Sequence, residues 1–233
     1  MKKCFFLLAV LFIAPLGTFA GDMGDDFHDH YIYGQSNLKA YNRDLNGLVG
    51  TMDFHITEPK DFPAISLGAS VSVFKPSSSN NISSDSYTVL PFLVAQTKIP
   101  YLGLGVVARG TSISGYRSVG GGLTYQMTAL EFLNLSFGAF YDNGRTEWYT
   151  NDHYSASAVA STTVLCLTPY IGVGYDYGKI KTRGYAQNES ASEGTPRGMV
   201  GLNISPFPLF TGFVSYIVTK DSHGFSGGLG LSF

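Results

Sequence analysis

The chain has 233 residues, of which 14% are charged and 14% aromatic, and its formal net charge is −2. An average soluble domain carries about 25% charged residues, so this composition argues against a soluble domain, and the weak negative charge offers no basic surface for nucleic acid. Its 28 Gly, 17 Phe and 15 Tyr against a single Trp are typical of a β-barrel with a lipid-facing outside and small residues inside.

Residues 1–20 have the pattern of a secretory signal peptide. Lys2 and Lys3 form a basic start, an apolar run follows from Phe5 to Pro15, and small residues near Ala20 fit a cleavage site. The apolar run is too short to span a hydrocarbon core, which needs about 20 apolar residues. No later stretch is long and apolar enough either, so the sequence excludes a helical membrane protein.

The rest of the chain divides into a flexible acidic segment over residues 21–29 and one barrel domain over residues 30–233. Cys166 is the only cysteine after the signal peptide, so no intramolecular disulfide is possible. The run His28-Asp29-His30 has metal-binding side chains, but a short segment near a cleaved terminus is more often simply flexible. We therefore expect no metal site and no cofactor.

Blocks of about ten residues that alternate between apolar and small polar side chains recur along the chain. In Ala64–Phe74 the apolar residues share one face of a strand and Ser and Gly take the other. Similar blocks are Leu48–Ile56, Val119–Met127, Leu133–Asp142 and Tyr170–Tyr177. A soluble sandwich would carry many charges on its outward face. The pattern predicts an all-β fold, an antiparallel transmembrane up-and-down β-barrel.

The segments between these blocks alternate in length. The short ones are 58–63, 98–100, 128–131 and 206–208. The longer polar ones are 75–85, 111–118, 143–153 and 182–197. Outer-membrane barrels have short periplasmic turns and longer extracellular loops, so we expect the short set to face the periplasm together with Phe233.

About eleven blocks follow residue 45, whereas bacterial single-chain barrels have even strand numbers. The candidate for a further strand is His30–Leu38, which contains Tyr31 and Tyr33. Twelve strands are therefore expected. Ten is the alternative, if Tyr154–Leu167 belongs partly to a loop and the N-terminal segment does not pair. Pro91 lies inside an otherwise regular block and predicts a β-bulge.

The last block, Gly224–Phe233, places apolar residues at alternate positions and ends the chain on an aromatic residue. The residues that carry this pattern are Phe225, Leu229, Leu231 and Phe233. It resembles the C-terminal assembly signal of outer-membrane proteins, although Gly227 lacks the apolar side chain of that pattern. The resemblance implies a location in the outer membrane and two partners, outer-membrane lipid and the barrel-assembly machinery. It leaves the oligomeric state open.

A second motif is Gly47-Leu48-Val49-Gly50-Thr51, followed by Ser66-Leu67-Gly68. It resembles the opening hairpin of porin-like and exopolysaccharide-associated outer-membrane barrels. Those barrels usually carry a Pro soon after the Thr, where this chain has Met52-Asp53.

Ionisable residues at inward positions are the candidate lining of the lumen. They are Asp53, His55, Arg109, Asp142 and Asp176. Ionisable residues at membrane depth face an interior or water, so they either line a water-filled pore or pair with one another in a closed lumen. A barrel of about eight strands is just filled by its side chains, whereas twelve strands lined by small residues would leave room for water.

The run His153-Tyr154-Ser155 follows a segment that contains Glu147 and Asp152. Some outer-membrane lipid A deacylases, which it resembles, use a His-x-Ser pair with an acidic residue that orients the His. Those enzymes usually have Asn after the Ser, where this chain has Ala156. We therefore expect a solvated loop end and no catalytic residue.

Three functions remain open at this point. The leading expectation is a narrow passive channel, porin-like, for small hydrophilic solutes. The alternative is a closed structural or surface-binding barrel that acts in adhesion through the segments 143–153 and 182–197. An esterase like the lipid A deacylases comes third.

Overall fold

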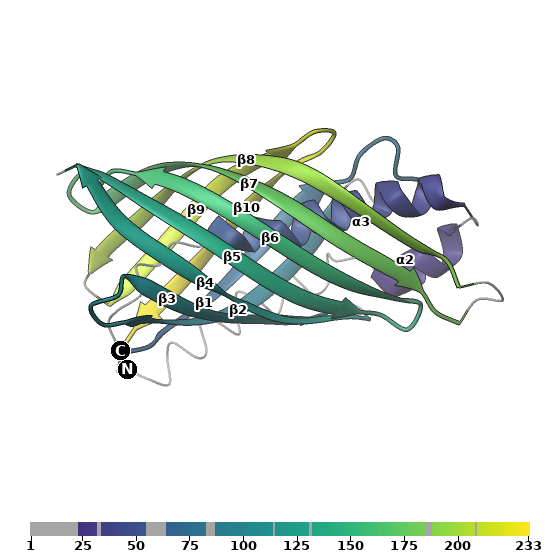
Figure 1. Ribbon diagram of the computed structural model, residues 1–233, viewed down its shortest axis with the longest axis horizontal. Helices are drawn as coiled ribbons and strands as arrows, with labels where there is room; N and C mark the ends of the chain where they lie inside the picture. The colour runs from purple at the N-terminus through teal and green to yellow at the C-terminus, as the bar shows by residue number, and fades with distance from the viewer. Residues whose placement is uncertain are drawn as a thin grey trace.

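The computed structural model describes residues 23–31, 34–54, 64–82, 87–113, 115–130, 132–184, 188–207 and 209–233. The strands in this part of the chain are β1 (Ser66–Lys75), β2 (Thr88–Ile99), β3 (Leu104–Ile113), β4 (Tyr116–Leu130), β5 (Leu133–Arg145), β6 (Tyr149–Ser161), β7 (Leu167–Thr182), β8 (Ser190–Phe207), β9 (Phe210–Thr219) and β10 (His223–Ser232). Each strand pairs antiparallel with the next, and β10 pairs with β1 to close the barrel (Figure 1). The barrel fold is confirmed, and its ten strands match the alternative to the expected twelve.

The strand count differs because the N-terminal segment is helical. Helix α2 spans Met23–His30, helix α3 spans Gln35–Gly50, and the 3₁₀ turn η2 spans Thr51–Phe54. The strand expected over His30–Leu38 is wrong wherever the structure describes it, and so is the strand expected to begin at Leu48. Tyr33 and His55 lie outside the described residues.

The helical spacing of apolar residues explains this error. Leu38, Tyr41, Leu45, Leu48 and Met52 follow one another at intervals of three or four residues, which places them on one face of a helix. A window that begins at Leu48 also alternates, and there the two periodicities cannot be told apart. The likeness of Gly47–Thr51 to an opening hairpin was therefore misleading, because this segment ends a helix and the first strand begins at Ser66.

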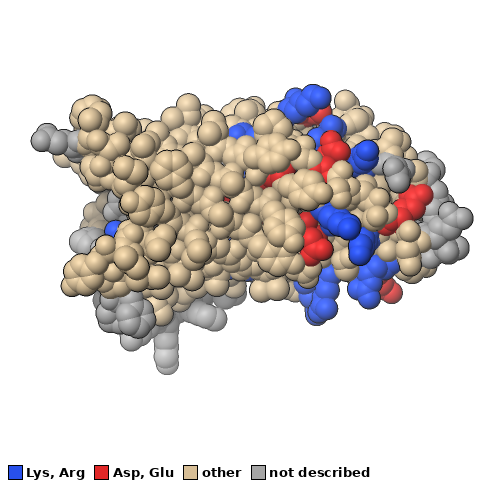
Figure 2. Space-filling view, viewed as in Figure 1, with Lys and Arg blue, Asp and Glu red and all other residues tan. Residues whose placement is uncertain are grey.

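The outer wall of the barrel is apolar across its middle. One row of directly paired outward residues contains Leu123, Ala139, Ala156 and Tyr175, and the next row contains Tyr141, Tyr154 and Tyr177. Figure 2 shows few charged side chains over this middle zone. A closed antiparallel barrel with an apolar band and aromatic rows is the architecture of outer-membrane proteins, and the chain is an outer-membrane barrel.

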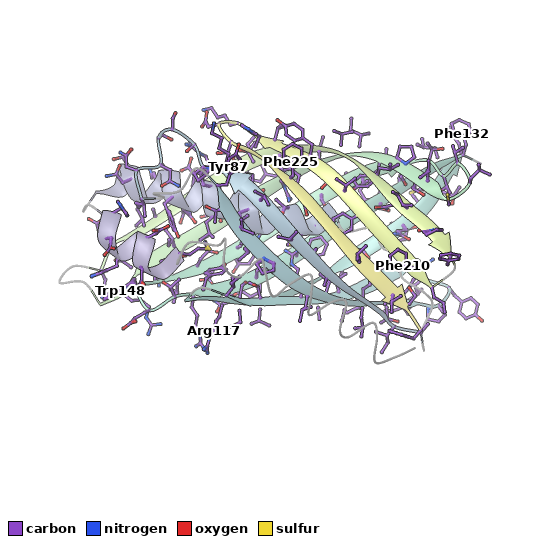
Figure 3. The ribbon with its side chains drawn as sticks, turned by 180° about the vertical axis from the view of Figure 1, so that it is seen from behind. Tyr87, Arg117, Phe132, Trp148, Phe210 and Phe225 are labelled. Carbon is purple, nitrogen blue, oxygen red and sulfur yellow. The ribbon has the colours of Figure 1, made fainter. Side chains whose placement is uncertain are left out.

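The two ends of the barrel differ. The end that carries Phe233 also carries the connections β2–β3, β4–β5, β6–β7 and β8–β9, with Phe132 and Phe210 nearby (Figure 3). We name it the C-terminal end, and the opposite end, near Trp148, the plug end. Strands at the plug end are longer than expected. Most of the polar segments read as loops, 111–118, 143–153 and 182–197, belong to strands, because polar residues there alternate between outer wall and lumen.

Two further expectations concern single strands. The register between β1 and β2 is continuous through the pair Val71–Pro91, so the bulge expected at Pro91 is wrong. On its other side, β2 pairs with β3 only over its residues Leu93–Ile99. Pro91 lies outside this range, so its missing N–H interrupts no hydrogen bond to β3. The terminal strand β10 closes the barrel, and Phe233 exchanges backbone hydrogen bonds with Ile65. Its role as an assembly signal stays a prediction.

The two helices fill the barrel from the plug end (Figure 1). Residues 23–29, expected to be flexible, lie in α2, where Phe27 is fully buried. The main cluster of buried apolar side chains joins the helices to the inner wall; its members include Phe27, Leu38, Tyr41, Leu48, Phe74, Leu90, Phe92, Tyr116, Tyr149 and Ile180. The hydrophobic core therefore lies inside the lumen. No described helix has the length and apolar character needed to cross a membrane.

Candidate functional site: the occluded lumen

Helix α3 presents a polar face to strands β7 and β8. The side-chain amide of Asn42 donates to the carbonyl oxygen of Gly178 over 2.9 Å, and that of Asn46 donates to the carbonyl oxygen of Glu193 over 3.3 Å. A Cβ atom on Gly178 would lie 1.9 Å from Oδ1 of Asn46. A glycine at this position thus lets the helix approach the wall closely and bond to its backbone.

The opposite side of α3 is fixed by the buried carboxylate of Asp44. Its Oδ2 accepts hydrogen bonds from the backbone N–H of Ser77 (2.8 Å), the hydroxyl of Ser77 (3.0 Å) and the amide of Asn80 (2.8 Å). Its Oδ1 accepts from the hydroxyl of Ser222 over 2.7 Å. Asp44 therefore ties the helix to two connections at the plug end, β1–β2 and β9–β10.

Helix α2 covers the lumen at the plug end with an aromatic cluster. The ring of Phe27 lies 4.9 Å from Tyr31, 5.1 Å from Tyr41 and 4.7 Å from Tyr149, measured between centroids. The hydroxyls of Tyr41 and Tyr149 are 2.8 Å apart, and the hydroxyl of Tyr31 donates to Oε2 of Glu189 over 2.5 Å. We use the term plug for α2, α3 and η2 together.

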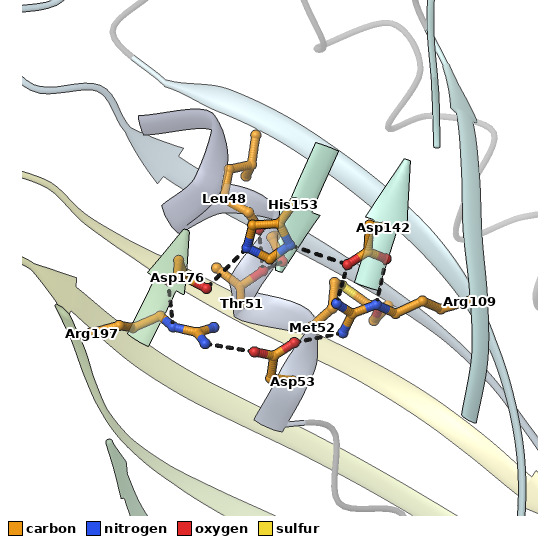
Figure 4. A network of polar contacts seen from close by, with 11 residues as sticks. Leu48, Thr51, Met52, Asp53, Arg109, Asp142, His153, Asp176 and Arg197 are labelled. Atoms are coloured by element: carbon orange, nitrogen blue, oxygen red, sulfur yellow. Dashed lines mark hydrogen bonds and ion pairs between the residues drawn. The ribbon is translucent and has the colours of Figure 1, made fainter. Parts of the chain in front are cut away.

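The tip of the plug is Asp53 in η2, and its carboxylate bridges two arginines of the wall. Oδ1 of Asp53 lies 2.7 Å from Nη1 of Arg109 on β3. Oδ2 lies 2.6 Å from Nη2 of Arg197 on β8. Because these strands are not neighbours in the barrel, a single carboxylate joins separate parts of the wall (Figure 4).

The same two arginines continue into a closed circuit of charges. Arg109 also binds both carboxylate oxygens of Asp142 on β5. His153 on β6 places Nδ1 3.2 Å from Asp142 Oδ2 and Nε2 3.0 Å from Asp176 Oδ1. Asp176 on β7 returns to Arg197, with Oδ2 and Nε 3.1 Å apart.

We call this set the lumen ring: Asp53, Arg109, Asp142, His153, Asp176 and Arg197. Acidic and basic groups alternate around it, and every one of these side chains is at least 98% buried. Such charges are stable in a lumen only when they are paired and hydrogen-bonded. The ring gives every member two oppositely charged partners, drawn from the wall and the plug.

Two glycines make room for the ring. Gly120 on β4 lies between Arg109 and Asp142 in the sheet register, and a Cβ there would come within 2.0 Å of Asp142 Oδ1. Gly50, at the end of α3, would place a Cβ 2.3 Å from Asp176 Oδ1. The first glycine lets Arg109 reach across β4, and the second lets the plug rest directly on the ring.

The structure brings together four of the five candidate lining residues, namely Asp53, Arg109, Asp142 and Asp176. The fifth, His55, lies outside the described residues. Sequence reasoning missed Arg197, which was assigned to a loop, and His153, which was assigned to a solvated loop end and is in fact fully buried. The signal that could have found them is alternation along the strand. His153 shares its face with Asn151 and Ser155, and Arg197 shares its face with Thr195 and Met199, all of them buried.

The His153–Ser155 pair is not arranged for nucleophilic catalysis. Both ring nitrogens of His153 contact carboxylates of the lumen ring. The hydroxyl of Ser155 is buried and has no hydrogen-bond partner in the described part of the chain. A base must lie within hydrogen-bond reach of the hydroxyl that it activates, and this imidazole is engaged elsewhere.

Among the described residues, no group of three or more His, Cys, Asp or Glu side chains is arranged to hold a metal ion. His28 of the run His28-Asp29-His30 stacks on Trp148 with ring centroids 3.9 Å apart. Nδ1 of His30 lies 3.0 Å from the carbonyl oxygen of Asp26, which is a contact within α2.

Toward the C-terminal end the described wall lines a polar cavity of about 350 Å³. Its polar lining includes Lys98, Gln126, Asn134, Ser136 and Asn203. The lumen therefore changes character along its axis, from an apolar, filled half at the plug end, through the lumen ring, to a hydrophilic half.

No protein-family model matches the chain, and no curated protein matches it in sequence. Among solved structures, the chain is similar to the KdgM porin in complex with disordered oligogalacturonate, with 11% identity, a TM-score of 0.43, and coverage of 72% of this chain and 99% of that chain. It is similar to the N-terminal β-barrel domain of Pseudomonas aeruginosa OprF, with 12% identity, a TM-score of 0.40, and coverage of 73% and 97%. It is also similar to Ail, the attachment invasion locus protein of Yersinia pestis, with 18% identity, a TM-score of 0.36, and coverage of 73% and 97%. Likenesses at this level assign no activity to the chain.

Proposed function

We propose that this protein is a closed outer-membrane barrel that acts at the cell surface through its plug end, and that its own N-terminal helices keep the lumen shut. The observation that carries the proposal is the bridge from Asp53 of the plug to Arg109 and Arg197 of the wall. Removing one partner of a buried ion pair typically costs about 3–5 kcal/mol. The bridge therefore opposes any movement of the plug tip away from the wall.

The apolar core inside the lumen supports the same proposal. A hydrophilic solute that crossed the barrel would have to displace side chains such as Leu38, Leu48 and Tyr41, which are almost completely buried against the wall. It would also have to part the lumen ring. A narrow passive channel, the leading expectation from the sequence, needs an open path and is the weaker candidate for this arrangement.

Planar-bilayer recordings test the closed state. Purified wild-type protein is expected to give no conductance steps above background. A variant that lacks residues 23–54 is expected to conduct, because the side chains of the plug then no longer fill the lumen. This variant also shows that the assay detects inserted barrels. Equal steady conductance of the two proteins would contradict the proposal.

A surface-binding role is assigned to the tips of the plug end, where the described chain turns at residues 146–148 and 183–184. Cells that display the wild-type barrel would be compared in adhesion assays with cells that display a variant whose residues 146–148 are replaced by Gly and Ser. Loss of adhesion in the variant is the expected result. Equal adhesion at equal surface display would remove these tips from the proposal.

A gated channel is the second candidate, and the polar cavity below the lumen ring favours it. In this alternative the plug leaves the lumen on a signal and the hydrophilic half becomes the conducting path. Asp53→Asn would then give intermittent openings in bilayers, whereas Asp152→Asn, which changes a carboxylate on the outer wall, would not. Silent recordings from both variants would count against gating through the ring.

A further inference from the structure

Basic side chains gather on the outer wall at the plug end. Arg117 on β4 is paired in register with Arg145 on β5, and Lys181 on β7 lies in the same row beyond Thr150 of β6. Lys179 lies one row lower and Arg183 follows the end of β7. All five cationic side chains are exposed, and Figure 2 shows Lys and Arg concentrated toward this end. We call this set the basic rim patch: Arg117, Arg145, Lys179, Lys181 and Arg183.

The patch carries an excess of positive charge, because only Lys179 of its five cations lies opposite a carboxylate in the sheet register, that of Asp152. Like charges directly opposite each other on paired strands are destabilising, yet Arg117 and Arg145 occupy such a pair. None of the five cations forms an ion pair with a described residue. The nearby carboxylate of Asp152 instead accepts hydrogen bonds from Tyr141 (2.9 Å) and Asn143 (2.8 Å).

The three arginines of the patch line one open groove of about 520 Å³. Its walls include Ser112, Gly115, Arg117, Arg145, Glu147 and Arg183. Guanidinium groups bind phosphate oxygens through paired N–H donors. Three guanidiniums against a single carboxylate therefore favour an anion with several oxygens, and phosphate matches that geometry.

The patch lies directly above the aromatic row of the outer wall. Tyr177 belongs to the row of Tyr141 and Tyr154, and Lys179 and Lys181 are the next outward residues along the same strand. With a rise of about 3.4 Å per residue, they lie roughly 7 and 14 Å along the strand from the Tyr177 position. Aromatic rows mark the membrane interface, so the cations lie at the height of lipid headgroups.

From these observations we propose that the basic rim patch binds the phosphate groups of the sugar headgroup of the outer-leaflet lipid. Basic clusters beside a membrane attract anionic headgroups by about 1 kcal/mol per Lys or Arg. A bound phosphate would relieve the repulsion between Arg117 and Arg145, and acyl chains of the same lipid would lie on the apolar rows below. The patch would then anchor a specific lipid at the rim, independently of whether the lumen is open.

Native mass spectrometry of the full-length barrel in detergent can test this. Diphosphorylated lipid A, the same lipid enzymatically dephosphorylated, and inorganic phosphate alone would be titrated into wild type and into the triple variant Arg117→Gln, Arg145→Gln, Arg183→Gln. Wild type is expected to bind the diphosphorylated lipid at least tenfold more tightly than the dephosphorylated one. The triple variant is expected to bind the diphosphorylated lipid more weakly by roughly 100-fold.

The matched control is the variant Lys75→Gln, Lys220→Gln, which removes exposed cations at the same end but outside the patch. It is expected to bind like wild type, and all three proteins should show the heat-modifiable gel mobility of folded barrels. An equal loss in triple variant and control would overturn the proposal, because general charge would then explain binding. Binding that ignores the lipid's phosphates would overturn it as well. If inorganic phosphate binds as tightly as the lipid, the proposed lipid ligand is wrong and the patch is a site for a free anion.

Discussion

Asp53 has the most direct effect on whether the lumen is closed, since its two carboxylate oxygens reach separate parts of the wall. One oxygen meets Arg109 and the other meets Arg197, and both arginines are also bonded to wall carboxylates. The wall residues could pair among themselves without the plug, but the two guanidiniums would then each lose a partner. The ring is therefore complete only with the plug in place.

Replacing Asp53 by Asn is expected to destabilise the folded barrel by about 3–5 kcal/mol, because the two buried guanidiniums lose their shared counter-charge. Urea-induced unfolding in lipid vesicles measures the change. The control is Asp152→Asn, whose carboxylate lies on the outer wall and should matter by no more than about 1 kcal/mol. Similar losses for the two variants would mean that the ring adds no specific stability.

Gly120→Ala is expected to destabilise the barrel by about 1–3 kcal/mol, the range typical of overpacking. The new methyl group would lie 2.0 Å from Asp142 Oδ1 and 2.4 Å from the carbonyl oxygen of Tyr141, and the backbone oxygen cannot move away easily. Gly198→Ala is the matched control, since its Cβ would find its nearest neighbour 3.4 Å away on Val218. The same unfolding assay should separate the two, and a stabilised Gly120→Ala protein would contradict the geometry.

At the scale of elements, strands with one lipid-facing side were the predictable part of the fold. In the middle of β1 and β7, over residues 67–73 and 171–177, apolar outward residues alternate with small or polar inward ones, so the type of these two elements could be predicted. The observed strand β7, Leu167–Thr182, extends beyond the predicted block Tyr170–Tyr177 at both ends. Strand ends at the plug end were harder to predict. There the outward residues, such as Arg117 and Lys181, lie above the lipid and are polar, so both faces of the strand carry polar residues. Polarity there reflects height in the membrane and not the end of a strand.

Helix α3 was not predictable in the same way. Its polar residues are not a solvated face, because Asn42 and Asn46 bond to the inner wall of the barrel and Asp44 bonds to the β1–β2 and β9–β10 connections. A helix that is polar on one side is interpreted from its sequence as a surface helix. The hydrogen-bond partners of these polar side chains are supplied only when the barrel closes around the helix. The alternation of inward and outward residues along a strand predicted that Arg109 and Asp142 face the lumen. No local sequence pattern could predict that they lie next to Asp53.

The apolar face of α3 gives a prediction at this scale. Leu45→Ala, at a side chain only 3% exposed, should destabilise the protein by about 2–5 kcal/mol through the cavity that it leaves in the lumen. Leu123→Ala removes the same atoms from the lipid-facing wall, where lipid tails fill the space, and should have a smaller effect. Unfolding in vesicles again gives the comparison. A larger loss for Leu123→Ala would place the main core outside the lumen.

At the scale of the whole molecule, the barrel begins and ends at the same end, whereas the two helices enter it from the other. Strand β1 starts beside Phe233 at the C-terminal end, whereas α2 covers the plug end and α3 lies inside the lumen (Figure 1). Short turns of outer-membrane barrels face the periplasm and longer loops face outward. We therefore expect the plug, the basic rim patch and the tip at Glu147 on the cell-surface side.

Thiol labelling of intact cells tests this orientation. Cys166 is exposed in the β6–β7 connection at the C-terminal end, so a membrane-impermeant maleimide should leave it unlabelled until the outer membrane is permeabilised. The variant Cys166→Ser, Glu147→Cys carries its thiol at the plug end, where the side chain is exposed, and should be labelled in intact cells. The single variant Cys166→Ser gives the background. Reversed labelling, with Cys166 modified in intact cells and the thiol at position 147 protected, would invert the barrel and place the plug and the basic rim patch on the periplasmic side.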